Sequence, residues 1–161
     1  MTAQDIIRLM KLEPLREEGG YFRRTFESRD VISTPRGKRF CGTAIYYLIT
    51  PESYSSLHRL PQDELFHFYL GDPVEMLQIF PSEEAKIITL GQSLASGEAL
   101  QVLVPGGIWQ GTRLREGGKW ALLGCTVVPG FEYADNEIGK RADLVALFPK
   151  HQSLILKYTR G

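Results

Sequence analysis

The sequence predicts an all-β domain, a sandwich or barrel, with short helices near its two ends. Short β-rich segments recur at a spacing of roughly 8–12 residues, which is typical of such folds. Clusters of Gly, Pro, Asp and Ser separate the segments and mark turns. The strand–helix–strand alternation of parallel sheets is missing. We expect the 161 residues to form one domain, residues 1–161, which is long enough to bury a core.

The first element is predicted to be a helix that ends at Pro14. Thr2 is placed to cap it, and Asp5 follows three residues later, as in a capping box. Its apolar stripe consists of Ile6, Ile7, Leu9 and Met10. A second helical pattern covers residues 141–149, and residues 153–158 fit either a strand or a last helical turn.

Strands are predicted between these helices. Residues 21–28 show some alternation, and residues 41–50 are apolar on both parities, which indicates a strand buried on two faces. We interpret residues 37–40 as a solvated turn. The remaining strand segments are residues 54–60, 64–70, 74–80, 85–91, 99–105, 108–114 and 119–133.

Composition argues against several classes of partner. Lys and Arg together number 19, as do Asp and Glu, so the excess positive charge that binds nucleic acid or anionic membranes is absent. Cys41 and Cys125 lie in apolar strand segments, as expected of reduced, buried thiols. The N-terminus lacks the features of a signal peptide, and no apolar run is long enough to span a membrane. We therefore expect a cytoplasmic protein that binds neither nucleic acid nor membrane.

One stretch, residues 55–73, holds two of the three histidines and resembles the first cupin motif. That motif reads G, five residues, H-x-H, three or four residues, E, six residues, G. His58 takes the first histidine position, Glu64 the acid and Gly71 the last glycine, but Leu60 occupies the second histidine position.

The second cupin motif, P-x-G-x-x-H-x-x-x-N, is also partly matched. Pro105 and Gly107 fit, while Gln110 stands at the histidine position and Leu114 at the asparagine position. The resemblance therefore implies the geometry of a metal site with much of its ligand set replaced.

The match extends over nearly the whole chain. The blocks "EGGYFRRTF", "TAIYYLITP", "HRLPQDELFHFYLGDP", "VPGGIWQG" and "LLGCTVVPGFEYADNEI" occur in that order. Together they resemble a small family of unknown function, cupin family five. The resemblance implies a double-stranded β-helix, the cupin jelly roll, and often a homodimer. It implies little about chemistry, because one fold hosts many functions.

Strand parity predicts which side chains share the barrel interior. Residues two apart lie on one face, so Glu64 and Phe66 share a face and His67 lies on the other. His58 and Leu60 share a parity on the preceding strand. If Glu64 faces the cavity, His58 is expected to line it too, and His67 to make a packing or hydrogen-bond contact outside.

The expected donors are too few to hold a metal tightly. Metal-binding cupins normally use three histidines and a carboxylate, whereas this cavity offers His58, Glu64 and the weak, neutral Gln110. We expect no tightly bound cofactor, although weak divalent-metal binding at His58 and Glu64 stays open. The two residues form either a hydrogen-bonded polar pair or a pair suited to acid–base chemistry.

Aromatic side chains are expected to line the rest of the cavity. The leading hypothesis is a cupin that binds a polar or sugar-like small molecule. Glu64 would anchor a hydroxyl or amine, and His58 would exchange a hydrogen bond with the ligand. The predicted lining consists of Tyr47, His58, Glu64, Phe66, Trp109 and Gln110.

Two alternatives stay open, and the sequence does not decide whether the protein is an enzyme. The first is a metal-free isomerase or epimerase that acts on a sugar nucleotide, with His58 as base and Tyr47 or Tyr133 as acid. The second is a structural dimer whose cavity is vestigial. Glu132, Asp135 and Glu137 are expected on a surface loop. The alternative is that, together with Phe131 and Tyr133, they cap the cavity or join a partner subunit.

Overall fold

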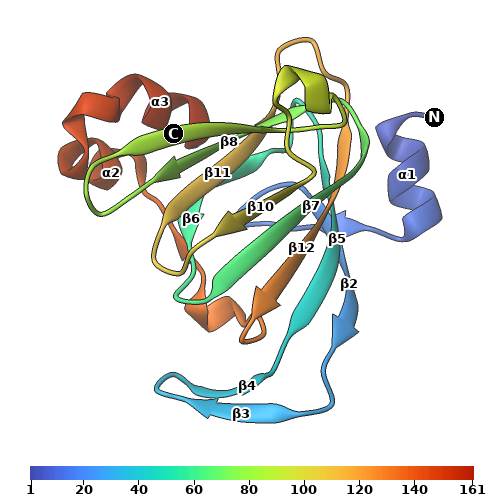
Figure 1. Ribbon diagram of the computed structural model, residues 1–161, viewed down its shortest axis with the longest axis vertical. Helices are drawn as coiled ribbons and strands as arrows, with labels where there is room; N and C mark the ends of the chain where they lie inside the picture. Colours follow the sequence, from blue (N-terminus) through green and yellow to red (C-terminus); the bar gives the residue numbers. More distant parts are fainter.

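The computed structural model describes residues 1–161 and consists mainly of β-strands (Figure 1). The α-helices are α1 (Ala3–Met10), α2 (Arg141–Leu147) and α3 (Gln152–Tyr158). Short 3-10 helices lie at Leu94–Ser96, Tyr133–Asp135 and Pro149–His151. The strands are β1 (Glu13–Pro14), β2 (Tyr21–Glu27), β3 (Val31–Thr34), β4 (Gly37–Phe40), β5 (Thr43–Ile49), β6 (Ser55–Arg59), β7 (Asp63–Gly71), β8 (Val74–Ile79), β9 (Ala85–Leu90), β10 (Gln101–Val104), β11 (Trp109–Leu114), β12 (Ala121–Val128) and β13 (Glu137–Ile138).

Two antiparallel sheets face each other and form the barrel. The six-stranded sheet has the order β1-β2-β5-β12-β7-β10, and the five-stranded sheet has the order β13-β6-β11-β8-β9. This architecture confirms the predicted all-β jelly roll with flanking helices. Each sheet presents one face to the interior, so the alternation within each strand decides which side chains meet there.

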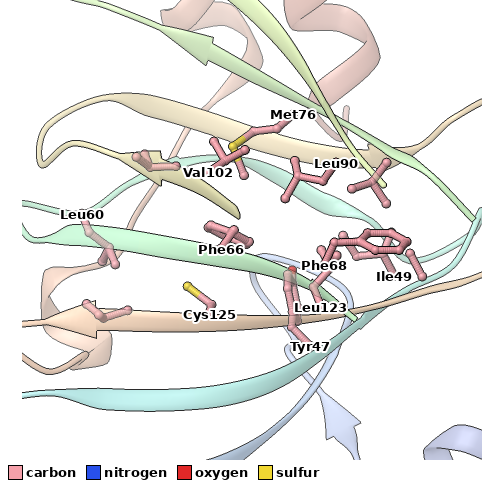
Figure 2. Packing of buried hydrophobic residues seen from close by; sticks show 14 of the residues in the cluster. Tyr47, Ile49, Leu60, Phe66, Phe68, Met76, Leu90, Val102, Leu123 and Cys125 are labelled. Carbon is pink, nitrogen blue, oxygen red and sulfur yellow. The ribbon is translucent and has the colours of Figure 1, made fainter. Parts of the chain in front are cut away.

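The main core lies between the two sheets (Figure 2). The six-stranded sheet contributes Tyr47, Phe66 and Cys125, and the five-stranded sheet contributes Met76 and Leu90. All five are buried. Because a packed core holds side chains in fixed rotamers, it fixes the position of the polar groups that lie among them.

The helices cover the outer faces of the two sheets. Leu144 of α2 and Ile155 of α3 pack with Leu57 and Trp109 of the five-stranded sheet. The N-terminal helix α1, capped by Thr2 and Asp5 as predicted, packs Ile6 onto the six-stranded sheet. Residues 153–158, which fitted either a strand or a helix, belong to α3. No helix of the chain is long and apolar enough to cross a membrane.

A hairpin that the sequence analysis missed projects from the barrel. Strands β3 and β4 pair with each other and form a separate two-stranded sheet at the bottom of Figure 1. Residues 37–40, predicted to be a solvated turn, therefore form strand β4. Gly37, at φ 107°, is the first residue of this strand and directly follows the hairpin turn.

An ion pair ties this hairpin to the barrel. Arg39 donates from Nε and Nη2 to the two carboxylate oxygens of Asp135, both at 2.8 Å, and both residues are buried. Gln62 adds a hydrogen bond of 2.6 Å from its amide nitrogen to Asp135. The predicted surface position of Asp135 is thus wrong, because the hairpin folds back and covers it.

Candidate ligand-binding site

One end of the barrel interior is hollow. The pocket encloses about 490 Å³ including its open mouth, but a water-sized molecule can be centred in only about 40 Å³ of it. The enclosed part of the pocket therefore has room for small groups only. The lining residues are Leu15, Glu18, Phe22, Arg24, Thr43, Ile45, Tyr47, Glu64, Phe66, Cys125, Val127, Phe131 and Tyr133.

Glu64 lies on the inner face of β7 and reaches the pocket. It is only 4% exposed. Its Oε2 accepts a hydrogen bond of 3.2 Å from the Gln110 amide, while its Oε1 meets the weakly donating Cys125 thiol at 3.9 Å. Burial raises the pKa of Glu64 to about 7, even though His58 and these donors pull it down. The carboxyl group therefore changes charge near neutral pH.

His58 lies on β6 behind this carboxyl group and is fully buried. Its Nδ1 is 2.7 Å from the Ser56 carbonyl oxygen, which can only accept, so Nδ1 carries a proton. Its Nε2 is 2.9 Å from the Gln110 amide and 3.5 Å from Glu18. Burial opposes the imidazolium, but the Glu18 and Glu64 carboxylates and the Ser56 carbonyl outweigh burial and raise the pKa of His58.

His58 and Gln110 do not line the pocket, contrary to the sequence prediction. The structure does bring both side chains to Glu64, because the Gln110 amide bridges His58 and Glu64 at 2.9 and 3.2 Å. A ligand in the pocket can therefore contact Glu64 and Glu18 directly, whereas His58 lies behind these two carboxyl groups.

Gln110 can serve either protonation state of this pair. As placed, its NH₂ group donates to an unprotonated His58 Nε2 and to an ionised Glu64, and its Oε1 has no partner. A half-turn of the amide would present Oε1 to an imidazolium N–H and to a protonated carboxyl group instead. The flipped amide would pair with both protonated groups, but its NH₂ group would then take the place that has no partner, so the orientation drawn here, with unprotonated His58 Nε2 and ionised Glu64, is the better satisfied one.

A second carboxylate, Glu18, was missed by the sequence analysis. It belongs to the loop between β1 and β2 and is 6% exposed. Its Oε1 accepts hydrogen bonds from Tyr47 at 2.9 Å and Ser55 at 2.8 Å, and its Oε2 lies 3.5 Å from the Asn136 amide.

The sequence feature that could have indicated the inward position of Glu18 is the pair of glycines that follows it in "EEGG". Gly20 has φ 77°, and a Cβ there would lie 2.5 Å from the Tyr47 ring. Glycine alone allows the backbone to approach that ring, which turns Glu18 inward. Arg160 holds the loop from the other side by donating to the Glu18 carbonyl oxygen at 2.8 Å.

Tyr47 and Phe66 line the pocket, as predicted. The Tyr47 hydroxyl is already engaged, since Glu18 Oε1 at 2.9 Å and the Gly19 carbonyl at 2.7 Å compete for its single proton. Burial, together with the Glu18 charge, raises the pKa of Tyr47 well above its ordinary value. Tyr47 therefore supports the position of Glu18 and is a poor proton donor.

The mouth of the pocket is formed by aromatic rings and an arginine. Phe131 and Tyr133 make an edge-to-face pair with 5.2 Å between ring centres. Arg24 donates to the Phe131 carbonyl at 3.1 Å and pairs with Glu27 at 3.3 Å. The predicted capping role of Phe131 and Tyr133 thus agrees with their position, and Tyr133 is 59% exposed there.

Trp109 lies on the face of β11 that points away from the cavity, so its predicted place in the cavity wall is wrong. It packs beneath the C-terminal helices with Leu57 and Leu144, and Arg59 stacks on its ring at 4.6 Å. Trp109 and Gln110 are adjacent on β11, and neighbouring residues of a strand point to opposite faces. Trp109 and Gln110 therefore cannot both point into the cavity.

The other histidines lie outside the pocket. His67 is on the outer face of β7, 3.2 Å from the Thr126 hydroxyl and 3.1 Å from Gln101. His151 contacts the Glu83 carbonyl oxygen near the surface. The position of His67 agrees with the outer contact that strand parity predicted.

The residues present do not fit the metal that the cupin fold commonly holds. Leu60, at the second histidine position, is buried among apolar side chains and has no donor atom. The His58 nitrogen that faces the site is met by the Gln110 amide. No three His, Cys, Asp or Glu side chains converge on a point where an ion would be coordinated.

Comparison with known proteins identifies relatives of similar size. A profile of the family described as "Cupin superfamily (DUF985)" matches residues 4–139. An uncharacterized protein of Saccharomyces cerevisiae is 28% identical over an alignment of 140 residues, and the match covers 78% of this chain and 70% of the yeast protein.

Solved structures show the same architecture. A hypothetical protein from Leishmania major is 33% identical with a TM-score of 0.93, covering 100% of both chains. A Shewanella oneidensis protein is 34% identical with a TM-score of 0.91, covering 99% of this chain and 98% of that one. Oxalate decarboxylase from Bacillus subtilis is 15% identical with a TM-score of 0.58, covering 93% of this chain and 37% of that one, a likeness that shows the fold alone.

Proposed function

The chain belongs to the DUF985 family of the cupin superfamily, and we propose that it binds a small polar ligand in the hollow end of its barrel. The observation that carries this proposal is the buried Glu64 carboxyl group on the wall of a pocket that is lined mainly by aromatic and aliphatic side chains. Few polar groups in a largely apolar concave site are typical of small-molecule binding.

Glu64 would make the polar contact at the inner end of the pocket. Its Oε1 has the Cys125 thiol at 3.9 Å as its one donor, so a ligand hydroxyl or amine would supply the hydrogen bond that the protein leaves weak. The remainder of the ligand, polar or sugar-like, would extend to the mouth and pack on Phe131 and Tyr133. The narrow inner volume suits a short substituent rather than a whole sugar ring.

A ligand screen with matched variants tests this proposal. Monosaccharides, amino sugars, nucleotide sugars and short alcohols and amines are screened by thermal shift, and calorimetry follows for each compound that raises the melting temperature. Glu64→Gln keeps the shape of the side chain and removes its charge, while Glu84→Gln makes the same change at an exposed turn. Binding that Glu64→Gln weakens and Glu84→Gln leaves intact supports the proposal.

The opposing outcome is a cavity that takes no ligand. If no compound shifts the melting temperature and a crystal structure shows the pocket closed by Phe131 and Tyr133, the pocket is vestigial. The structural dimer would then be the better description of the protein.

A second candidate function, acid–base catalysis without a metal, is favoured by the protonation of Glu64. A carboxyl group with a pKa of about 7, in contact with a bound molecule, is suited to proton transfer at neutral pH. Glu64 would exchange the proton with the substrate, and the nearby His58 would stabilise the ionised form of Glu64 electrostatically. Tyr133, free at the mouth, fits the role of acid better than Tyr47.

Isotope exchange distinguishes catalysis from binding. Nucleotide sugars incubated with the protein in D₂O are examined by NMR for loss of a carbon-bound proton. Exchange in the wild type that disappears in Glu64→Gln would establish the chemistry. Binding without exchange would leave the protein a binder.

A further inference from the structure

The inner end of the pocket presents a hydrogen-bond acceptor and is therefore complementary to a ligand group that donates. Three donors near this end are already used: Tyr47 and Ser55 donate to Glu18, and the Gln110 amide donates to Glu64. Glu64 Oε1, on a residue that is 4% exposed, has only the thiol contact at 3.9 Å. When Glu64 is ionised, a carboxylate or phosphate placed against Oε1 would meet another acceptor, so this position favours a hydroxyl or an ammonium.

The charges around the opening favour the ammonium. A second hollow shares Phe22 and Tyr133 with the pocket and is lined by Glu13, Arg16 and Glu17. The two hollows together are lined by four carboxylates and two arginines. Part of the positive charge of Arg24 is offset by Glu27, and Arg24 also donates to the Phe131 carbonyl. A surplus of negative charge in a concave, low-dielectric surface attracts cations.

The walls favour a cation as well. Phe22, Phe66, Phe131 and Tyr133 line the pocket, and an ammonium group near aromatic faces is attracted by the electron-rich rings. An alcohol gains no comparable interaction. The small enclosed volume suits a short alkylammonium rather than a branched or bulky amine.

We propose that the pocket takes the primary ammonium end of a small aliphatic amine, placed against Glu64 Oε1 and between the aromatic rings. This rests on the proposed function and narrows its ligand from a polar molecule to an amine. The rest of the amine lies at the mouth, beside Phe131 and Tyr133.

Three probes of equal size test the charge preference: n-propylammonium, n-propanol and propionate. Binding to the full-length protein is measured at about pH 8 by chemical-shift changes, with wild type, Glu64→Gln and Glu84→Gln compared. We expect wild type and Glu84→Gln to bind n-propylammonium at least about tenfold more tightly than n-propanol, since a charged hydrogen bond exceeds a neutral one by about 1.4 kcal/mol. Propionate is expected to be the weakest of the three.

Glu64→Gln is expected to lose the preference for the amine while still binding n-propanol. If that variant does not fold, the ranking in wild type and Glu84→Gln decides. Equal or tighter binding of n-propanol in wild type would overturn the amine assignment and leave the proposed function standing. A preference for the amine that survives in Glu64→Gln would also overturn it, because the ammonium would then lie elsewhere. Failure of all three probes and of the monosaccharides would overturn both proposals.

Discussion

Replacing Glu64 by Gln is expected to stabilise the protein, and increasingly so as the pH rises. The pKa of Glu64 rises from 4.5 to about 7 on folding because burial disfavours its charge. A group whose pKa is raised in the folded state stabilises that state at low pH, and this contribution is lost as the pH rises through the folded value. Wild type therefore loses stability through the range in which Glu64 must ionise inside the barrel.

The magnitude follows from the same two values. Since each tenfold change in a proton-binding constant is worth about 1.4 kcal/mol, the full rise from 4.5 to about 7 corresponds to roughly 3 kcal/mol. Between about pH 5 and about pH 8 the expected change is roughly 2–3 kcal/mol. The raised pKa of His58 acts in the same direction, because its imidazolium is favoured partly by the Glu64 carboxylate that the variant removes.

Urea unfolding measures this change. The free energy of unfolding of Glu64→Gln, minus that of wild type, is expected to grow by roughly 2–3 kcal/mol from about pH 5 to about pH 8. Glu84→Gln, at an exposed turn, is expected to keep a constant difference from wild type. If the free energy of unfolding of Glu64→Gln minus that of wild type stays constant or shrinks as the pH rises, Glu64 ionises without penalty. The description of Glu64 as a buried carboxyl group with a raised pKa would then be wrong.

Four further expectations follow. Asp135→Asn should lower the free energy of unfolding by about 3 kcal/mol at neutral pH, because it leaves Arg39 buried without its partner charge. Since Arg39 lowers the pKa of Asp135, this loss of stability should shrink as the pH falls below 3.8. A loss of stability that does not change with pH in this range would contradict the ion pair. Gly20→Ala should cost more in urea than Gly117→Ala, since both have positive φ but only Gly20 faces the Tyr47 ring, and equal costs would exclude that contact. After dialysis without chelator, elemental analysis should find far less than one equivalent of transition metal per chain, and a full equivalent would contradict the donor analysis. Light scattering should give the mass of the homodimer expected for the family, whereas a monomer at high concentration would refute it.

The parts of the fold set by local patterns were predictable. Glu64 and His67 were assigned to opposite faces of one strand by their spacing alone, and the structure places them so. The capping box of α1 likewise depends on residues close together in the chain. Trp109 was misplaced because its neighbour Gln110 occupies a motif position, although adjacent residues of a strand point to opposite faces.

The parts set by contacts between distant segments were not predictable. Glu18 enters the site because a loop from the start of the chain folds over Tyr47, 29 residues away, and is held by Arg160, 142 residues away. Asp135 is buried by a hairpin whose Arg39 lies 96 residues before it. A single sequence contains no periodicity that reports such pairings, so an acidic residue in a loop is assigned to the surface by default.

The central claim is that a neutralisable carboxyl group at Glu64 forms the polar floor of a ligand pocket. The most direct measurement is an NMR titration of the side-chain carboxyl carbon of Glu64 in ¹³C-glutamate-labelled protein, assigned with Glu64→Gln, without and with n-propylammonium. We predict a midpoint of about 7 in the free protein and a lower midpoint when the amine is bound. A midpoint near the ordinary 4.5, unchanged by the amine, would contradict the claim.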